Sequence, residues 1–542
     1  MQKITVLSLL FLTVSLGVSA QDYSNYSSLT SRAKALEKKY PTLVKVKSLT
    51  QTLGNKDIWM LTIGTGNTSE KPAIAVVGGV EGAHLLGVEL AIGFAEQLLA
   101  QSGTDSIKTL LDKQTFYVFP NMSPDASEQY FTKLKYARSG NARATDDDRD
   151  GKTNEDPFED LNGDGKITMM RIEDPTGEWL ISEEDARVMV KADFSKGQKG
   201  KYLLLSEGMD NDKDGVFNED GEGGVAFNKN MSYNYPNFVS GSGEHMVSEK
   251  ENRALLDFLF EAFNVYAVVS FGPYNNLSAP VSFNKAGVGK RIISSWYKED
   301  ADVNELVSKS YNKLVKEKNA PATTGTPGNF AEWAYFHYGR FSFSTPGWWV
   351  PESKPDTTLK QKALTEKNGE ANYLRWAEQQ KASNFFTPWT VVKHPDFPEQ
   401  KVEVGGVDPF AMINPPYTMV ASIVKEHTEF IEALAKMAPE IETANLKIEK
   451  LDGGLTRISL DVINKGAMAT QTKVGEKTNW VKDIHVALKS NGQMITGKAN
   501  QTISAIPGYG SEHLTWLVKA SGKATLTLES PSNGKKIISI NL

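Results

Sequence analysis

The 542-residue chain contains no cysteine, so it forms no disulfide bonds, and no acylated cysteine can anchor its N-terminus to a membrane. Its stability must therefore come from a large core or from bound ions. The chain also lacks an excess of positive charge, because 60 Lys and Arg face 66 Asp and Glu, for a mildly acidic net charge of −6. Since the basic surface of a nucleic-acid-binding protein is missing, we expect no nucleic-acid partner.

The chain also lacks the long hydrophobic run that a membrane span requires. Its apolar run near the N-terminus, residues 4–18, is short for a span and contains polar residues. Lys3 precedes this run and small residues occupy 18–20, a pattern typical of an export signal. We therefore expect residues 1–20 to be removed, so that the mature chain begins at Gln21. It would then be periplasmic, outer-surface associated or secreted, and would contain no transmembrane segment.

Strand and helix patterns alternate between residues 21 and 437, which predicts an α/β domain. A chain of this length has room for two or more domains and, at 40% hydrophobic residues, for a sizeable core. The expected strands are residues 44–49, 58–63, 115–120 and 265–271, and the expected helices are residues 23–40, 248–262, 303–317 and 427–437. We expect the dense aromatic segment at residues 333–349 to run as a strand.

Residues 73–100 pass from a buried-strand pattern through Gly78 and Gly79 into a helix pattern. A strand, turn and helix in this order place the turn at the carboxyl edge of an α/β sheet, where ligands usually bind. Glu81 and His84 lie three residues apart in that turn, and both residue types bind metal ions. The alternative is that His84 only begins the helix and hydrogen-bonds a neighbouring group.

An insertion at residues 146–224 interrupts the α/β pattern with Asp, Asn and Gly. The pattern D-x-D-x-D-G-x-x-N-E-D occurs at residues 146–156 and again at 210–220, and residues 160–165 read D-x-N-x-D-G. Carboxylates at alternate positions before a Gly turn wrap oxygen atoms around a hard cation, which predicts bound calcium. Arg171 stands where an EF-hand loop ends in Glu, which favours isolated loops. A solvated acidic linker is the alternative. The expected calcium ligands are Asp146, Asp148, Asp150, Asp156, Asp160, Asn162, Asp164, Asp210, Asp212, Asp214 and Asp220.

The sequence pattern changes after residue 437. Short alternating strands follow one another, separated by Gly and Asn turns, at residues 456–462, 484–488, 513–518 and 525–528. This pattern predicts that residues 438–542 form a β-sandwich of the size of an immunoglobulin-like domain. Domains of this kind most often bind a partner, act as a spacer or anchor the protein. The sequence of residues 438–542 suggests no catalytic residues.

Several segments resemble, in order, motifs of the zinc carboxypeptidase family, the metallocarboxypeptidases of the carboxypeptidase A type. The resemblance covers roughly residues 23–437, with the insertion set aside. It implies a mixed sheet flanked by helices, a zinc ion held by His, Glu and a second His, and a Glu that acts as general base. The segments are GGVEGAHLLG from Gly78, SPDA from Ser123, FNKN from Phe227, SEKENRAL from Ser248, GNFAEWAY from Gly328 and FSF from Phe341.

The residues that carry the chemistry in this family are altered here. The family pattern H-x-x-E is reversed in Glu81 and His84, and Gly272 falls where the resemblance places the third zinc ligand. Pro346 stands at the position of the general base, so we assign no catalytic residue. The resemblance thus implies a vestigial zinc site at Glu81 and His84 and makes a bound zinc doubtful.

The substrate-binding positions are better kept. The family grips the terminal carboxylate of its substrate with an Asn-Arg pair and a further Arg. Asn228 matches the Asn, whereas Lys229 replaces the Arg and keeps the charge without the bidentate fork. Arg143 is the expected further Arg, with Arg138 as the alternative.

Two further groups leave alternatives open. Among the seven histidines, His337 lies in the aromatic segment and is either a packed or surface residue or, with His84 and a carboxylate, a metal ligand. The adjacent Trp348 and Trp349 are either both core residues or place one ring in a ligand cleft.

These observations predict an exported member of the carboxypeptidase family that is catalytically degenerate and binds a peptide C-terminus or a protein partner. One alternative is an active metallocarboxypeptidase with a reorganised metal site. Another is a structural component of a surface assembly, stabilised by calcium.

Overall fold

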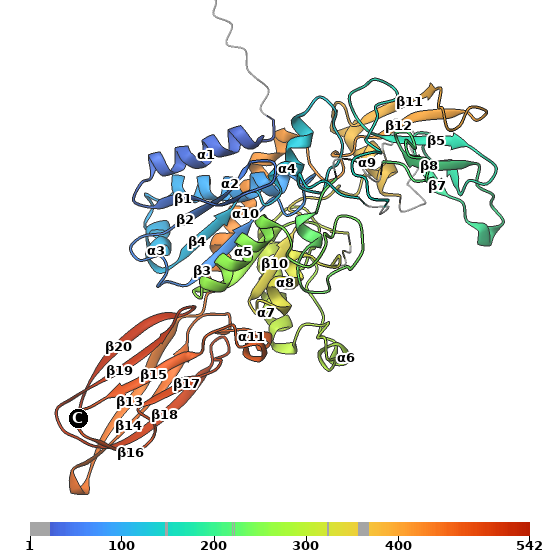
Figure 1. Ribbon diagram of the computed structural model, residues 1–542. Coiled ribbons are helices and arrows are strands. Elements are labelled where there is room, and N and C mark those ends of the chain that lie inside the picture. Colours follow the sequence, from blue (N-terminus) through green and yellow to red (C-terminus); the bar gives the residue numbers. More distant parts are fainter. Residues whose placement is uncertain are drawn as a thin grey trace, which may run out of the picture.

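The computed structural model describes residues 22–146, 150–218, 221, 223–321, 323, 325–355 and 368–542 (Figure 1). The expected export signal lies outside these residues, as do Asp148 and Asp220 of the expected calcium loops. Figure 1 shows an α/β body that carries a smaller sheet on one side and an elongated β-rich unit at the C-terminal end.

A six-stranded mixed sheet forms the centre of the α/β body. Its strands follow the order β1-β2-β4-β3-β9-β10, in which β4, β3, β9 and β10 are parallel and β1 and β2 are antiparallel to their neighbours. The four parallel strands are fully buried, as their continuous apolar runs predict. The bounds are β1 Val44–Gln51, β2 Asp57–Ile63, β3 Ala73–Val77, β4 Thr115–Phe119, β9 Val265–Phe271 and β10 Phe341–Thr345.

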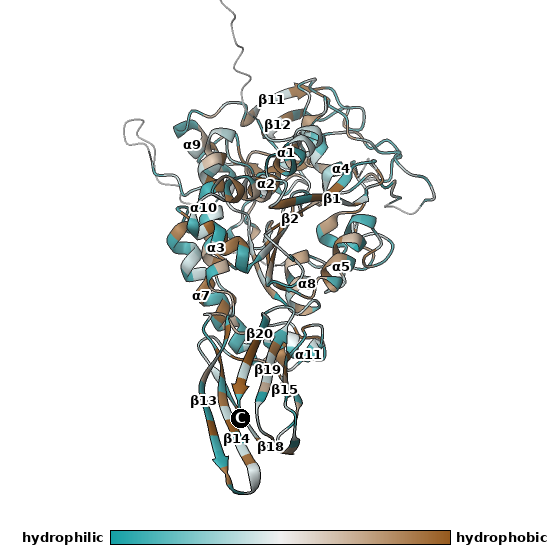
Figure 2. Cartoon of the chain, turned by 90° about the vertical axis from the view of Figure 1, so that its left-hand side faces the viewer, coloured by the Kyte–Doolittle hydropathy of each residue, from teal (hydrophilic) through white to brown (hydrophobic). Residues whose placement is uncertain are grey.

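Alternate side chains of these strands enter two separate cores. In β3, Ile74 and Val76 belong to the core beneath α2 and α10, whereas Ala75 and Val77 belong to the core beneath α5 and α8. Figure 2 shows hydrophobic residues in the central strands and hydrophilic ones on the outer helices. The helices of the body are α1 Tyr26–Lys39, α2 Leu85–Ala100, α3 Asp105–Lys113, α4 Pro124–Ser127, α5 Lys250–Glu261, α6 Lys285–Val288, α7 Lys298–Leu314, α8 Phe330–Phe336, α9 Gly369–Gln379 and α10 Tyr417–Lys436, with the 3-10 turns η1 Glu128–Phe131 and η3 Phe227–Lys229.

The insertion contributes to a second, smaller sheet, which the sequence did not predict. The sheet has the order β11-β12-β5-β8-β6-β7 and is antiparallel throughout. Four of its strands come from the insertion and two from residues 386–407, and its core contains Met170, Ile172, Val402 and Val404. The bounds are β5 Met169–Glu173, β6 Trp179–Ile181, β7 Met189–Lys191, β8 Tyr202–Ser206, β11 Phe386–Val392 and β12 Val402–Val407, with η2 at Phe194–Lys196.

The C-terminal unit consists of two four-stranded antiparallel sheets, β13-β14-β18-β16 and β17-β15-β19-β20, with Trp516 buried in its core. Every strand that the sequence predicted for this region is present. The bounds are β13 Ile441–Leu451, η4 Asp452–Gly454, β14 Leu455–Asn464, α11 Lys473–Thr478, β15 Ile484–Lys489, β16 Gln493–Thr496, β17 Asn500–Ile503, β18 Ser511–Lys519, β19 Lys523–Ser530 and β20 Gly534–Asn541.

Helix α11 joins this unit to the α/β body. The backbone N–H groups of Lys473 and Val474 donate to the two carboxylate oxygens of Asp300 in α7, at 2.7 and 3.3 Å. Val474 also packs into the core beneath α5 and α8. The two parts are therefore in direct contact through α11.

Two expected elements are wrong. Residues 333–349 do not form one strand, because the segment divides into the end of α8 and then β10, and the helix predicted at residues 427–437 begins ten residues earlier as α10. Within the described ranges, we find no helix that has both the length and the apolar character needed to cross a membrane.

Candidate functional site

The turn after β3 lies at the carboxyl edge of the central sheet, as predicted. Gly79 adopts a left-handed conformation (φ 60°), and a Cβ atom on it would approach the Asn121 side chain to 2.2 Å. A Cβ atom on Gly78 would lie 2.4 Å from the Gly87 carbonyl oxygen. Only glycine therefore fits at either position, and the tight turn places Val80, Glu81 and His84 beside the ends of β9 and β10.

His84 uses its imidazole within the protein. The side chain is 5% exposed, and Nε2 donates to the carbonyl oxygen of Pro346 at 3.0 Å. Nδ1 meets no hydrogen-bond geometry with a described residue and faces Gly87, beside the Phe271 carbonyl. Burial lowers the pKa of His84 from 6.5 to about 4, so the ring is neutral near pH 7.

Glu81 is bonded to one of the predicted substrate-binding residues. Its Oε1 accepts from the Nδ2 of Asn228 at 2.7 Å, while the Oδ1 of Asn228 accepts from the backbone N–H of Phe330 at 2.8 Å. Burial raises the pKa of Glu81, and the Asn228 hydrogen bond opposes that rise. Both ends of the Asn228 amide are therefore engaged within the protein. Its Nδ2, which the resemblance assigns to the terminal carboxylate of a substrate, is hydrogen-bonded to the carboxylate of Glu81 instead.

Val80 fills the space in front of Gly272. A Cβ atom on Gly272 would lie 2.5 Å from Cγ2 of Val80, so no larger side chain fits there without movement of Val80. The Gly272 N–H donates to the Thr345 carbonyl at 3.0 Å, which ties the end of β9 to the residue before Pro346. The two altered positions, Gly272 and Pro346, therefore lie together at the same sheet edge as His84.

Buried polar groups support this edge from behind. The Tyr311 hydroxyl lies 2.8 Å from Oγ1 of Thr345 and 3.1 Å from Nε2 of His427. Nδ1 of His427 donates to the Ile423 carbonyl at 2.8 Å, and burial lowers its pKa to about 4. His427 is thus neutral near pH 7, and it supports the end of β10 through Tyr311.

The predicted cationic residues have their own partners. The Nε of Arg143 donates to both carboxylate oxygens of Glu249, at 3.0 and 3.2 Å, and Nζ of Lys229 donates to the Ser240 carbonyl at 3.2 Å. Arg138, the alternative to Arg143, donates to the backbone carbonyls of Gly140 and Asn141. The structure thus brings Glu81 and Asn228 into contact but directs Arg143 and Lys229 to other groups.

These donors do not fit a zinc ion. A zinc site needs at least three converging ligands, whereas Nε2 of His84 binds a carbonyl, Oε1 of Glu81 binds an amide and residue 272 has no side chain. Within the described part of the chain, one group of three His, Cys, Asp or Glu side chains has ligand atoms within 4.8 Å of one another, and it consists of Asp210, Asp212 and Asp214.

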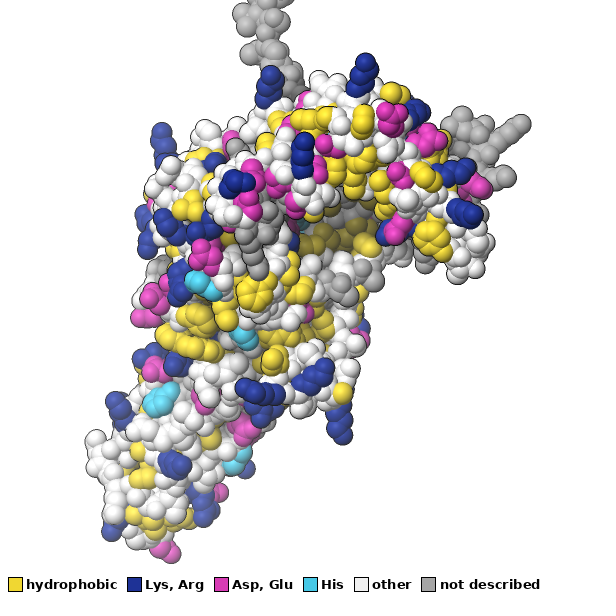
Figure 3. All heavy atoms as spheres, turned by 45° about the vertical axis from the view of Figure 1, so that its right-hand side comes forward, with side chains coloured by type: hydrophobic (Ala, Val, Ile, Leu, Met, Phe, Trp, Pro, Cys, Tyr) yellow, Lys and Arg dark blue, Asp and Glu magenta, His cyan; other side chains and the backbone are white. Residues whose placement is uncertain are grey.

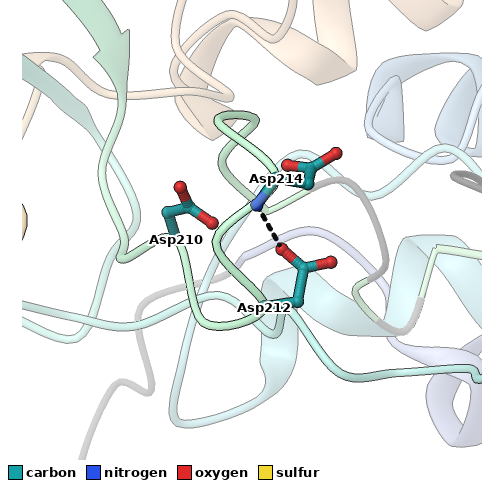
Figure 4. A group of neighbouring side chains, drawn as sticks. All are labelled: Asp210, Asp212 and Asp214. Carbon is teal, nitrogen blue, oxygen red and sulfur yellow. Dashed lines mark hydrogen bonds between the residues drawn. The ribbon is translucent and has the colours of Figure 1, made fainter.

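That group lies in the second copy of the repeated loop (Figure 4). Oδ2 of Asp210 accepts from the N–H of Gly215 at 3.0 Å, and its Oδ1 is buried without a partner. The first copy repeats this geometry, since Oδ2 of Asp146 accepts from the Gly151 N–H at 3.1 Å and its Oδ1 is also buried and unpartnered. Both loops therefore leave a carboxylate oxygen at the same position without a partner among the described residues.

The other expected calcium ligands are engaged with protein groups. Both oxygens of Asp160 accept backbone N–H groups of its own loop, and those of Asp156 accept from Asn211 and Asn218. Asp164 accepts from Lys166 and from Thr387 of β11, while Asn162 accepts from Asp164. Asp150 accepts from the backbone N–H and from the ammonium group of Lys152.

The structure also places the histidine and the two tryptophans for which the sequence left alternatives open. His337 ends α8, so its expected place on a strand is wrong, and its Nδ1 lies 2.9 Å from Oγ of Ser232. Trp348 and Trp349 are both buried, and Nε1 of Trp349 donates to the Lys318 carbonyl. The described residues therefore show neither ring in a cleft and no metal group that includes His337.

The sequence did not reveal the partners that close the site. Val80 was not identified as the residue that fills the place of the third ligand, and Glu249 was not identified as the partner of Arg143. Both contacts join segments far apart in the chain, and no local pattern announces them.

The fold is an α/β body whose strand β3 ends in a tight turn at the carboxyl edge of the central sheet. A family model described as zinc carboxypeptidase matches residues 29–347, more than half of the chain. The chain belongs to the zinc carboxypeptidase family. A second model, described as a domain of unknown function (DUF8731), matches residues 440–541.

Curated relatives are similar over a short stretch. Human carboxypeptidase D is 30% identical over 145 residues, which cover 26% of this chain and 10% of the relative. The rat carboxypeptidase D is 29% identical over 138 residues, 24% of this chain and 10% of the relative. The chain therefore spans about a tenth of the length of these relatives.

Solved structures are similar at low identity. Thrombin activatable fibrinolysis inhibitor is 11% identical and aligns over 76% of this chain and 74% of its own, with a TM-score of 0.42. Carboxypeptidase A from Helicoverpa armigera is 12% identical and aligns over 76% and 73%, with a TM-score of 0.39.

Proposed function

We propose that the chain is an exported, catalytically degenerate member of its family that binds a peptide C-terminus or a protein partner. The observation that carries the proposal is the hydrogen bond from Nε2 of His84 to the Pro346 carbonyl. In the family, the corresponding positions would supply a zinc ligand and a general base. Here the imidazole binds the backbone of the residue that replaces the base, so neither group is available for hydrolysis.

A binding role is supported by the cationic groups at the expected substrate-binding positions. Arg143 keeps about a third of its side chain exposed, and the charged group of Lys229 is held by one backbone carbonyl. Figure 3 shows a hollow edged by hydrophobic side chains between the part that carries the second sheet and the rest of the body. An apolar hollow of this kind suits the apolar residues of a bound peptide.

The proposal is tested by metal analysis and peptide hydrolysis with the purified full-length protein. We expect no stoichiometric zinc after dialysis in zinc-containing buffer and no release of C-terminal residues from a broad peptide library. The contrary hypothesis, an active enzyme with a reorganised site, requires one zinc per chain and release that a chelator and the His84→Ala variant both abolish. That result would exclude the degenerate-site proposal.

Calcium binding by the repeated loops is a second proposal. Its support is the buried and unpartnered Oδ1 of Asp146 and of Asp210, each beside the same Asp-to-Gly hydrogen bond. Carboxylate oxygens without a partner are costly to bury, and a calcium ion would satisfy them. The bound ions would stiffen the loops next to the second sheet. Such stiffening would suit a protein that serves as a structural component of a surface assembly.

Export is the remaining part of the proposal, and its support is the charge and hydropathy pattern of residues 1–20. N-terminal sequencing of the protein from its native host tests it. The expected first residue is Gln21, and recovery of an intact Met1 from a mature preparation would contradict export by cleavage.

A further inference from the structure

A pocket of about 550 Å³ lies outside the candidate active site, where α5, α8 and the segment after α11 meet. Its wall is aromatic and includes Phe260, Trp333, Phe336 and Trp480. Figure 3 shows hydrophobic side chains and a histidine gathered on this surface between the α/β body and the C-terminal unit. The volume lies in the range of small-molecule sites, and Glu81, His84 and Pro346 do not line it.

The backbone of Trp480 is hydrogen-bonded to the α/β body, while its ring is partly exposed. The buried guanidinium of Arg340 donates to the Trp480 carbonyl at 3.3 Å, and Asn479 before it is left-handed (φ 59°). The indole is nevertheless 47% exposed and tilts by 49° against Phe260, with ring centroids 4.6 Å apart. Its N–H forms no hydrogen bond with any described residue, so the ring offers both an apolar face and an unused donor.

The rim of the pocket is polar and electrically balanced. Arg253 and Asp257 lie one turn apart on α5 and are both exposed, yet they form no ion pair with each other or with another described residue. His337 also lines the pocket, and its Nδ1 is paired with Ser232. An apolar occupant would bury these charged groups without partners, and an ion of either sign would meet a like charge.

We propose that this pocket binds a pyranose ring of a neutral oligosaccharide. The apolar face of the ring packs on Trp480, as aromatic side chains favour flat apolar surfaces. Hydroxyl groups donate to the Asp257 carboxylate and accept from Arg253 and the indole N–H, which satisfies the rim without adding charge. The pocket does not include Glu81, His84 or Pro346. The proposal for the pocket is therefore independent of whether the chain hydrolyses peptides.

The test is a calorimetric titration of the full-length protein with neutral tetrasaccharides of glucose, mannose and N-acetylglucosamine. We expect saturable binding of at least one of them, with quenching of tryptophan fluorescence. The Trp480→Ala variant should weaken that binding by about tenfold or more, and Trp480→Phe by less, because a ring remains. Asp257→Ala changes an exposed residue without touching the core and should also weaken binding.

The matched control is Phe194→Ala, which removes an aromatic ring that is 62% exposed in the insertion and should leave binding unchanged. Absence of binding by all three tetrasaccharides at millimolar concentration would overturn the proposal. Equal affinity in Trp480→Ala and in the control would do the same. Tighter binding of a phenylalanine-rich peptide at this pocket would assign it to a protein partner instead.

Discussion

At the scale of single residues, the positions where the resemblance places the zinc ligands and the general base are linked to one another by contacts. Pro346 has no carboxylate, but its backbone oxygen accepts from the imidazole of His84. Gly272 has no side chain where the resemblance places a ligand, and Val80 occupies the space in front of it. At both positions a neighbouring group uses the space or the backbone oxygen. If the proposed degenerate site is correct, a single substitution cannot create a zinc site.

This argument predicts the outcome of rebuilding the ligands. The variant with Glu81→His, His84→Glu and Gly272→His should bind no zinc, because a Cβ atom at position 272 would lie 2.5 Å from Cγ2 of Val80. Adding Val80→Ala removes that clash and should allow zinc uptake, measured by calorimetry and metal analysis. Val80→Ala alone is the control and should bind none. Equal zinc affinity with and without Val80→Ala would show that Val80 does not block the site.

A second prediction at this scale concerns acid stability. Burial lowers the pKa of His427 to about 4 from 6.5, so below pH 6.5 the unfolded chain takes up a proton that the folded chain refuses. Stability should therefore fall as the pH falls from 6.5 towards 4. Between pH 7 and pH 5, the wild type should lose about 2 kcal/mol more unfolding free energy than His427→Gln, measured by denaturant titration. Parallel losses in the two proteins would contradict this assignment.

At the scale of elements, buried strands and amphipathic helices could be predicted from the sequence. Strands that contain Pro or Gly, and one short helix, could not. The run VYAVVSF predicted β9 with its observed bounds. In contrast, β11 contains Pro388 and β12 contains Gly405 and Gly406, residues that normally count against strands, so the sheet that joins them to the insertion was missed. Helix α8 has seven residues rich in aromatics, too few for a helical period to show.

The calcium loops give a prediction at this scale. Calcium at about a hundred times its dissociation constant should raise the unfolding free energy of the wild type by about 3 kcal/mol relative to a chelator. Asp210→Asn should reduce this gain, because it weakens the loop whose first carboxylate leaves an oxygen unpaired. Asp105→Asn, which changes a fully exposed Asp outside the loops, should keep it. Thermal and denaturant melts measure both, and an unchanged wild-type melt would contradict calcium binding.

At the scale of the whole molecule, the two parts could be predicted but not their contact. The change in strand pattern near residue 438 separates the α/β body from the C-terminal sheets, and the family models match on either side of it. Asp300, however, stands in the first turn of α7, where an acidic residue ordinarily faces solvent and favours the helix dipole. Its sequence context gives no sign that it is buried and bound to another part of the chain.

The last prediction tests whether Asp300 fixes the C-terminal unit to the body. This carboxylate is 2% exposed and accepts from the N–H groups of Lys473 and Val474 and, at 2.7 Å, from the hydroxyl of Tyr335. Asp300→Ala leaves these three buried donors unpaired, which should cost about 3 kcal/mol, whereas Asp300→Asn keeps an acceptor and should cost less.

The cost should fall on the junction between the two parts. In limited proteolysis, Asp300→Ala should be cleaved near residue 438 faster than the wild type, because loosening α11 exposes the connecting chain. Asp302→Ala removes an exposed carboxylate from the same helix and serves as the control, with an expected change within about 0.5 kcal/mol. Equal protease resistance in the Asp300→Ala and Asp302→Ala proteins would show that packing around Val474, rather than the Asp300 carboxylate, holds the two parts together.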